Sequence, residues 1–183
     1  MTYPIAVHLR CPVFLVSLLL TVVVAWLMAA PLKTEHAPLG IVSLELARYP
    51  EMAQRVIGSW TPEQQAQAAA GVRWDFLWLL CYSTTISLAC VWAAGVLGRS
   101  NFLAKIGIFL AWLLWLAALL DAVENVALLQ MLGGSTQSPW PQLAYGCALV
   151  KFDIVILGLL YVFGGGGLVF LWQKIRLTIN LVV

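Results

Sequence analysis

Four long apolar runs, separated by polar segments, dominate the pattern of this chain. They cover about residues 11–30, 74–97, 106–132 and 141–163. Each is long enough for an α-helix to cross about 30 Å of hydrocarbon. The pattern predicts an all-α fold, a membrane-embedded four-helix bundle, in which residues 1–183 form a single membrane domain.

The first run also has a second interpretation, as a cleaved signal peptide. His8 and Arg10 would form its basic end, and Met28-Ala29-Ala30 a rough cleavage site. The run is longer than a usual signal core and lacks a clean Ala-x-Ala site. We therefore favour a retained span.

Residues 31–73 form the only long polar stretch, and we expect a partly helical loop there. Apolar residues from Ile41 to Ala47 have the spacing of a short amphipathic helix. Thr61-Pro62-Glu63-Gln64 has the form of a helix start, with Thr61 as N-cap and Gln64 closing a capping box. Gly71 is the only breaker after it, so this helix is able to continue into the second span.

The placement of Lys and Arg predicts the orientation. Arg10, the turn from Arg99 to Lys105, and the pair Lys174 and Arg176 all fall on one side, in short segments. Such segments are typically cytoplasmic. We expect a cell-membrane protein with both termini cytoplasmic and the 31–73 loop extracytoplasmic. The apolar tail 164–183 either prolongs the fourth span, lies in the interface or is disordered.

Composition agrees with lipid as the solvent. Hydrophobic residues make up 62% and charged residues 10% of the chain, against about 45–50% and about 25% in soluble domains. The net charge of +2 does not suggest a nucleic-acid partner. Two histidines at opposite ends of the first run, and four cysteines without a CxxC pair, predict neither a metal site nor a cofactor.

Several ionisable groups nevertheless lie inside the spans, where they are costly and point to function. Asp121, Glu124 and Asn125 are spaced i, i+3, i+4 and so share one face of the third span. Lys151 and Asp153 lie at a similar depth in the fourth span, so Lys151 is expected to pair with Asp121 or Glu124. Together with two residues of the second span, these form the candidate polar pocket: Asp75, Tyr82, Asp121, Glu124, Asn125, Lys151 and Asp153.

The charges in this pocket do not balance. Four acids face two bases, Arg73 and Lys151, which leaves two negative charges unmatched. Such a site is expected to hold a proton, bind a cation or admit water. The alternative is a purely structural lock, in which polar groups hold the helices together at about 0.6–2 kcal/mol per bond.

Four short motifs resemble a family of small bacterial four-span membrane proteins. They are Trp74-Asp75-Phe76, Leu120-Asp121-Ala122-Val123-Glu124-Asn125, Pro139-Trp140-Pro141 and Val150-Lys151-Phe152. The Asp-Ala-x-Glu-Asn stretch is the most specific, and the likeness covers about residues 11–163. The resemblance implies the topology and draws attention to the cluster, but it implies no reaction.

Two functions fit these features. The first, which we favour from the sequence, is a non-catalytic module that binds a lipid or small apolar ligand, or belongs to a membrane assembly with another membrane protein. The second is an intramembrane acid–base enzyme or a proton-coupled carrier that uses the carboxylates. Whether the protein is an enzyme stays open at this point.

The orientation is testable by labelling a cysteine introduced at Gln67. Because the loop is expected outside, an impermeant thiol reagent should label Gln67→Cys in intact cells. Protection in intact cells, followed by labelling after lysis, would reverse the assignment.

Overall fold

The computed structural model describes residues 3–98 and 101–167, which are helical apart from connecting segments and contain no strand. The long helices are α1 (Val7–Met28), α4 (Pro62–Leu97), α5 (Phe102–Leu132) and α6 (Trp140–Leu160), and α6 continues into the π-helix η1 (Tyr161–Gly167). Two short helices, α2 (Ile41–Glu45) and α3 (Pro50–Gly58), lie between α1 and α4. Of the apolar tail expected at 164–183, residues 168–183 lie outside the described residues.

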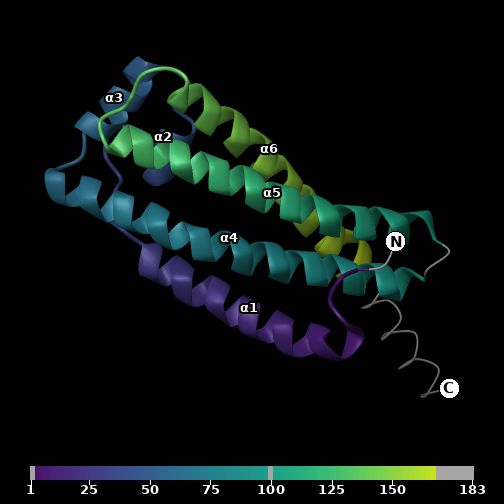
Figure 1. Ribbon diagram of the computed structural model, residues 1–183. Helices are drawn as coiled ribbons and strands as arrows, with labels where there is room; N and C mark the ends of the chain where they lie inside the picture. Colours follow the sequence, from purple (N-terminus) through teal and green to yellow (C-terminus); the bar gives the residue numbers. More distant parts are fainter. Residues whose placement is uncertain (1–2, 99–100, 168–183) are drawn as a thin grey trace.

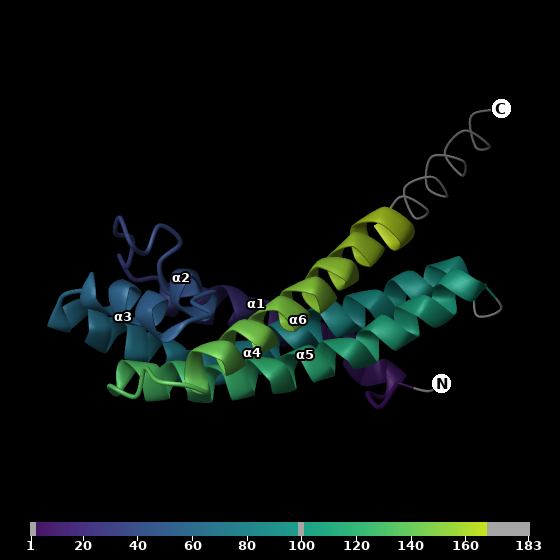
Figure 2. The same ribbon diagram turned by 90° about the horizontal axis from the view of Figure 1, so that it is seen from above.

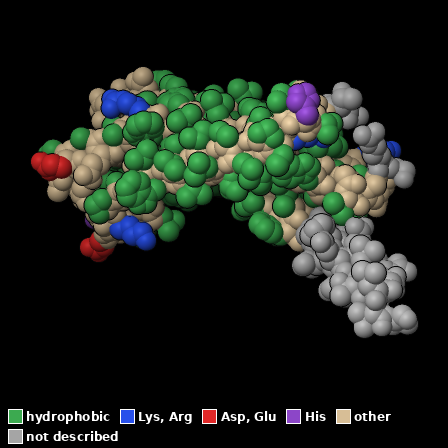
Figure 3. Space-filling model, turned by 90° about the horizontal axis from the view of Figure 1, so that it is seen from below, with side chains coloured by type: hydrophobic (Ala, Val, Ile, Leu, Met, Phe, Trp, Pro, Cys, Tyr) green, Lys and Arg blue, Asp and Glu red, His purple; other side chains and the backbone are tan. Residues whose placement is uncertain are grey.

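Four helices in the described part of the chain are long and apolar enough to cross a membrane: α1, α4, α5 and α6 with the start of η1. Hydrophobic side chains cover the middle of the face shown in Figure 3, and acidic side chains are seen only toward one end. These features support a multi-pass membrane protein, in agreement with the sequence.

The long helices pack in chain order. α1 lies against α4, α4 against α5, and α5 against α6, while α4 and α6 touch much less (Figure 1). α6 then crosses the pair so that η1 packs on α4 (Figure 2). The expected bundle is therefore a row of antiparallel helices with a crossing fourth member.

Small residues set the close approach of α4 and α5. Ser83 and Ser87 on α4 are fully buried, as are Ala111 and Ala117 on α5. The Ser87 hydroxyl donates a hydrogen bond to the Ala111 carbonyl at 2.7 Å. Small side chains allow such backbone proximity inside a membrane, where interhelical packing replaces the hydrophobic effect.

The second apolar run belongs to a much longer helix. α4 begins at Pro62, with Thr61 as N-cap: the Thr61 hydroxyl accepts from the Gln64 amide at 3.3 Å, and Gln64 Oε1 accepts from the Thr61 amide at 3.0 Å. Its 36 residues extend about 54 Å, well beyond about 30 Å of hydrocarbon. The helix is therefore longer than one span requires, and its first turns give the loop a surface to pack on.

The loop between α1 and α4 closes one end of the helix row. A continuous apolar cluster joins its buried residues, including Leu44 and Trp60, to Val72 on α4 and to Leu128 on α5. Trp60 also donates from Nε1 to the Leu32 carbonyl at 2.7 Å, which ties the two ends of the loop together. This packing holds α2 over the ends of α5 and α6 and determines where the last residue of α2, Glu45, points.

Candidate functional site

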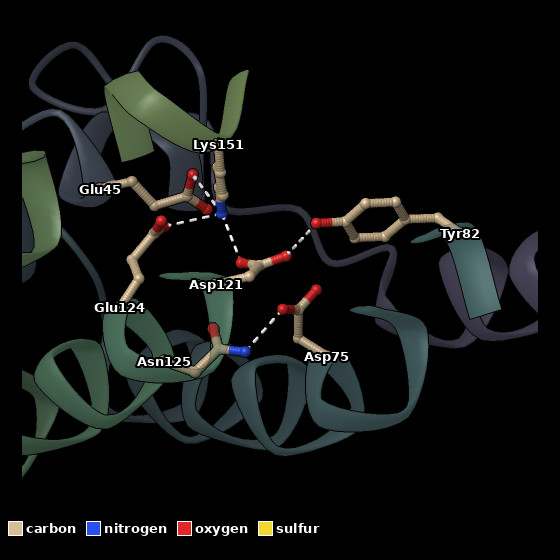
Figure 4. Close-up of polar contacts among 7 residues, drawn as sticks. All are labelled: Glu45, Asp75, Tyr82, Asp121, Glu124, Asn125 and Lys151. Atoms are coloured by element: carbon tan, nitrogen blue, oxygen red, sulfur yellow. Dashed lines mark hydrogen bonds and ion pairs between the residues drawn. The ribbon is translucent and has the colours of Figure 1, made fainter. Parts of the chain in front are cut away.

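The site is built around the ammonium group of Lys151 on α6. Its Nζ donates to Asp121 Oδ1 at 2.6 Å and to Glu124 Oε1 at 2.9 Å, and lies 3.7 Å from Glu45 Oε2 (Figure 4). Lys151 is 7% exposed, and Asp121 and Glu124 are almost completely buried. The expected pairing of Lys151 with Asp121 or Glu124 is thus present with both partners at once.

Two further hydrogen bonds join α4 to α5 beside the ammonium. The Tyr82 hydroxyl donates to Asp121 Oδ2 at 2.9 Å, and Asn125 Nδ2 donates to Asp75 Oδ2 at 2.6 Å (Figure 4). Both oxygens of Asp121 therefore have a donor. Asp121 is the best-compensated acid of the site, as a fixed counter-ion for Lys151 requires.

Helix periodicity explains most of this convergence. Asp121, Glu124 and Asn125 occupy one face of α5, and Asp75 and Tyr82, seven residues apart, occupy one face of α4. α5 packs between α4 and α6, so its polar face is able to contact groups from both neighbours. Six of the seven predicted pocket residues meet here.

Asp153, the seventh predicted pocket residue, does not join this cluster. It is exposed on the outside of α6, because two residues along an α-helix correspond to a rotation of about 200°. Lys151 and Asp153 therefore point to opposite sides of the same helix. Arg73, counted in the charge balance, is also exposed and forms no ion pair with any described residue.

Glu45 is the cluster member that sequence reasoning missed. It belongs to the loop, outside the four expected spans, yet it is 8% exposed and sits beside Lys151 (Figure 4). Its position between Leu44 and Leu46 was the available signal. A charged residue within an apolar stretch of a short loop helix is a candidate for burial against a partner.

Two carboxylate oxygens of the cluster have no hydrogen-bond donor among the described residues. They are Glu45 Oε2 and Glu124 Oε2, both buried. The two side chains lie on the same ammonium (Figure 4), but two carboxylates have no proton to share. Burial raises the pKa of Glu45, against the opposing effect of the nearby Lys151 charge. One proton held between these carboxyls would satisfy both oxygens.

A small cavity opens beside the cluster, between α2, the end of α1, the N-terminal half of α4 and α5. Its volume is about 40 Å³, and Glu45, Asp75, Asn125 and Gln67 supply its polar lining. A site of this size holds a few water molecules with polar partners. Drug-sized ligands need roughly 300–1,000 Å³, so this cavity suits water or a small ion.

The chemistry available at this site is proton binding and hydrogen bonding. Three carboxyl groups surround one ammonium, the carboxyl of Asp75 lies beside them on Asn125, and a phenol and a carboxamide are additional donors. Within the described ranges, no group of three or more His, Cys, Asp or Glu side chains is arranged to hold a metal ion. Comparisons with known proteins found no matching family model, no matching curated protein and no matching solved structure.

Removing Asp121 should destabilise the protein strongly. Asp121→Ala takes an acceptor from both Lys151 and Tyr82, and breaking a buried pair from one side costs about 3–5 kcal/mol. The exposed Glu63 on the first turn of α4 provides the control, since fully exposed charges contribute little to stability. We expect a clearly lower melting temperature in detergent for Asp121→Ala than for Glu63→Ala. Equal temperatures would contradict the buried ion pair.

Docking of α2 should weaken as the pH rises. The pKa of Glu45 is raised in the folded protein, so the docked state binds its proton more tightly than the undocked state. The stability that this bound proton gives to the docked state is fully present below the ordinary glutamate pKa of 4.5. It is lost as the pH rises from there through the raised pKa of Glu45. Amide hydrogen exchange of residues 41–45, corrected for intrinsic rates, should show less protection at about pH 8 than at about pH 5.5.

Substitution separates Glu45 from other causes of that pH dependence. Glu45→Gln imitates the protonated side chain and should flatten the dependence. Glu51→Gln, which changes an exposed acid of α3, should leave it intact. A Glu45→Gln protein with an unchanged dependence would show that another group controls α2.

Proposed function

We propose that this multi-pass membrane protein uses its buried carboxyl cluster to exchange protons with the side of the membrane on which the 31–61 loop lies. The observation that carries the proposal is the pair of donor-free oxygens, Glu45 Oε2 and Glu124 Oε2, beside a single ammonium. One exchangeable proton, shared by the two carboxyls, is the simplest species that would give both oxygens a hydrogen-bond partner. This behaviour is common to acid–base enzymes and proton-coupled carriers.

The division of roles within the cluster supports proton exchange. Lys151 and Tyr82 both donate to Asp121, so both of its oxygens already have a hydrogen-bond donor. Glu124 accepts a hydrogen bond from Lys151 alone, and Glu45 has only the 3.7 Å ion-pair contact with the same ammonium. Carboxyl groups in unequal environments are the arrangement that acid–base chemistry uses. A structural lock would instead have every polar oxygen satisfied.

The cavity favours this proposal over the binding of an apolar ligand. Its volume of about 40 Å³ and its polar groups suit water, which carries protons to buried carboxyls. Most of the cavity lining is apolar, but the lipid or apolar-ligand module that the sequence favoured would need a much larger pocket. On this proposal, membrane lipid is only the solvent around the helices, and the cluster binds and releases protons.

The orientation of the protein in the membrane and its resemblance to a known family are also part of this proposal. The distribution of Lys and Arg supports a cell-membrane protein with cytoplasmic termini, which makes the loop side extracytoplasmic. The resemblance to small bacterial four-span proteins stays a proposal, and three of its motifs contribute residues to the cluster: Asp75, the Asp121–Asn125 stretch and Lys151.

Infrared difference spectroscopy tests proton exchange directly. Between about pH 5 and about pH 9, the purified protein in lipid should lose a protonated-carboxyl band. Glu124→Gln should diminish this change, as should Glu45→Gln, because either removes one member of the pair that shares the proton. Glu51→Gln in the loop should preserve it.

A silent spectrum would remove the enzyme and carrier functions together and leave the structural lock. A band that persists in both cluster variants would place the titrating group elsewhere. In either case the proposed proton exchange at Glu45 and Glu124 would be wrong.

A further inference from the structure

A charged side chain lies on the outer surface of α6 at the middle of the apolar layer. Asp153 is exposed and has no hydrogen bond or ion pair with any described residue. The candidate span runs from Trp140 to Gly164, so Asp153 lies about 20 Å along the helix from one end and about 16 Å from the other. Ionisable residues at this depth face protein or water rather than lipid.

The surroundings of Asp153 form a regular seam. Gly146, Leu149, Asp153, Ile156 and Leu160 follow a 3-4-3-4 spacing, and all five are exposed. This spacing presents one continuous stripe to a neighbouring helix, as in left-handed helix pairs. A side chain at Gly146 would meet nothing within 4 Å, so the backbone there is open to close approach.

We propose that this seam binds a transmembrane helix of another membrane protein that carries a Lys or Arg at mid-membrane depth. The charge of Asp153 determines the chemistry of the partner, because an ammonium or guanidinium would provide the counter-ion that this chain does not provide. The single acid at a central seam position would also fix the register of the two helices. Lys151 is unable to serve, since its ammonium is engaged on the opposite side of α6.

A second copy of the chain fits the seam less well. Two identical helices meeting symmetrically along this stripe would bring their Asp153 side chains toward each other. Like charges at such close range are destabilising, most of all in a medium of low dielectric constant. A basic partner is therefore favoured, and self-association is an outcome that the experiment distinguishes.

The experiment measures how strongly defined transmembrane peptides bind the full-length protein in phosphatidylcholine vesicles. The peptides are Leu-Ala helices with one central residue, either Lys or Leu, and binding is followed by fluorescence energy transfer. A central Lys reaches the same depth in either orientation of the peptide. We expect the Lys peptide to bind wild-type protein more tightly than the Leu peptide, by roughly threefold to twentyfold.

Matched variants assign that preference to the seam. Asp153→Asn should remove most of it, and Asp153→Leu all of it. Gly146→Leu should weaken binding of both peptides by blocking close approach, while Glu51→Gln in the loop should change neither. Circular dichroism of each variant checks that the fold is retained.

Three results would overturn the inference. The first is equal binding of the Lys and Leu peptides to wild-type protein. The second is an undiminished preference for Lys in folded Asp153→Asn. The third is energy transfer between differently labelled copies of the chain that disappears in Asp153→Asn, which would identify the seam as a self-association surface. None of these results depends on proton exchange in the cluster, so the two proposals fail independently.

Discussion

One ammonium group, that of Lys151, is the constraint on which the arrangement of this protein depends. A lysine buried among apolar helices is tolerable only with anions in direct contact. Asp121 and Glu124 provide them from α5, and Glu45 approaches from α2. Because those carboxyls belong to separate elements, satisfying one charge draws α5, α6 and the loop helix together at a single point.

The loop takes part in the site because of its own hydrophobic packing. Leu44 and Trp60 pack in one cluster with Val72 and Leu128, and this burial places α2 above the ends of the long helices. Glu45 is thereby carried into a position that electrostatics alone would not favour, since the site already contains more acids than bases. Apolar packing thus sustains an excess of acidic groups over basic ones, and the proposed proton exchange rests on that excess.

α6 separates two charges with different roles. Lys151 points inward and completes the cluster, while Asp153 points outward from the same turn of helix. The inner charge is compensated within the chain, so it holds the fold together. The outer charge has no partner among the described residues, and we propose that a basic helix of another protein provides one. On that proposal a single turn of helix serves both the internal site and an assembly surface.

Much of the architecture and most of the cluster could be predicted from the sequence by itself. Span lengths reflect the thickness of hydrocarbon, and i, i+3, i+4 spacing fixes the shared face of Asp121, Glu124 and Asn125. Local periodicity places Lys151 and Asp153 on opposite sides of α6 but could not decide which of the two faces α5, so Asp153 was included in the pocket although it shares no face with Lys151. Nor could it show that Glu45, over 70 residues before Asp121 in the chain, reaches the same ammonium. Both depend on how separate elements pack, and only the tertiary structure determines which faces meet.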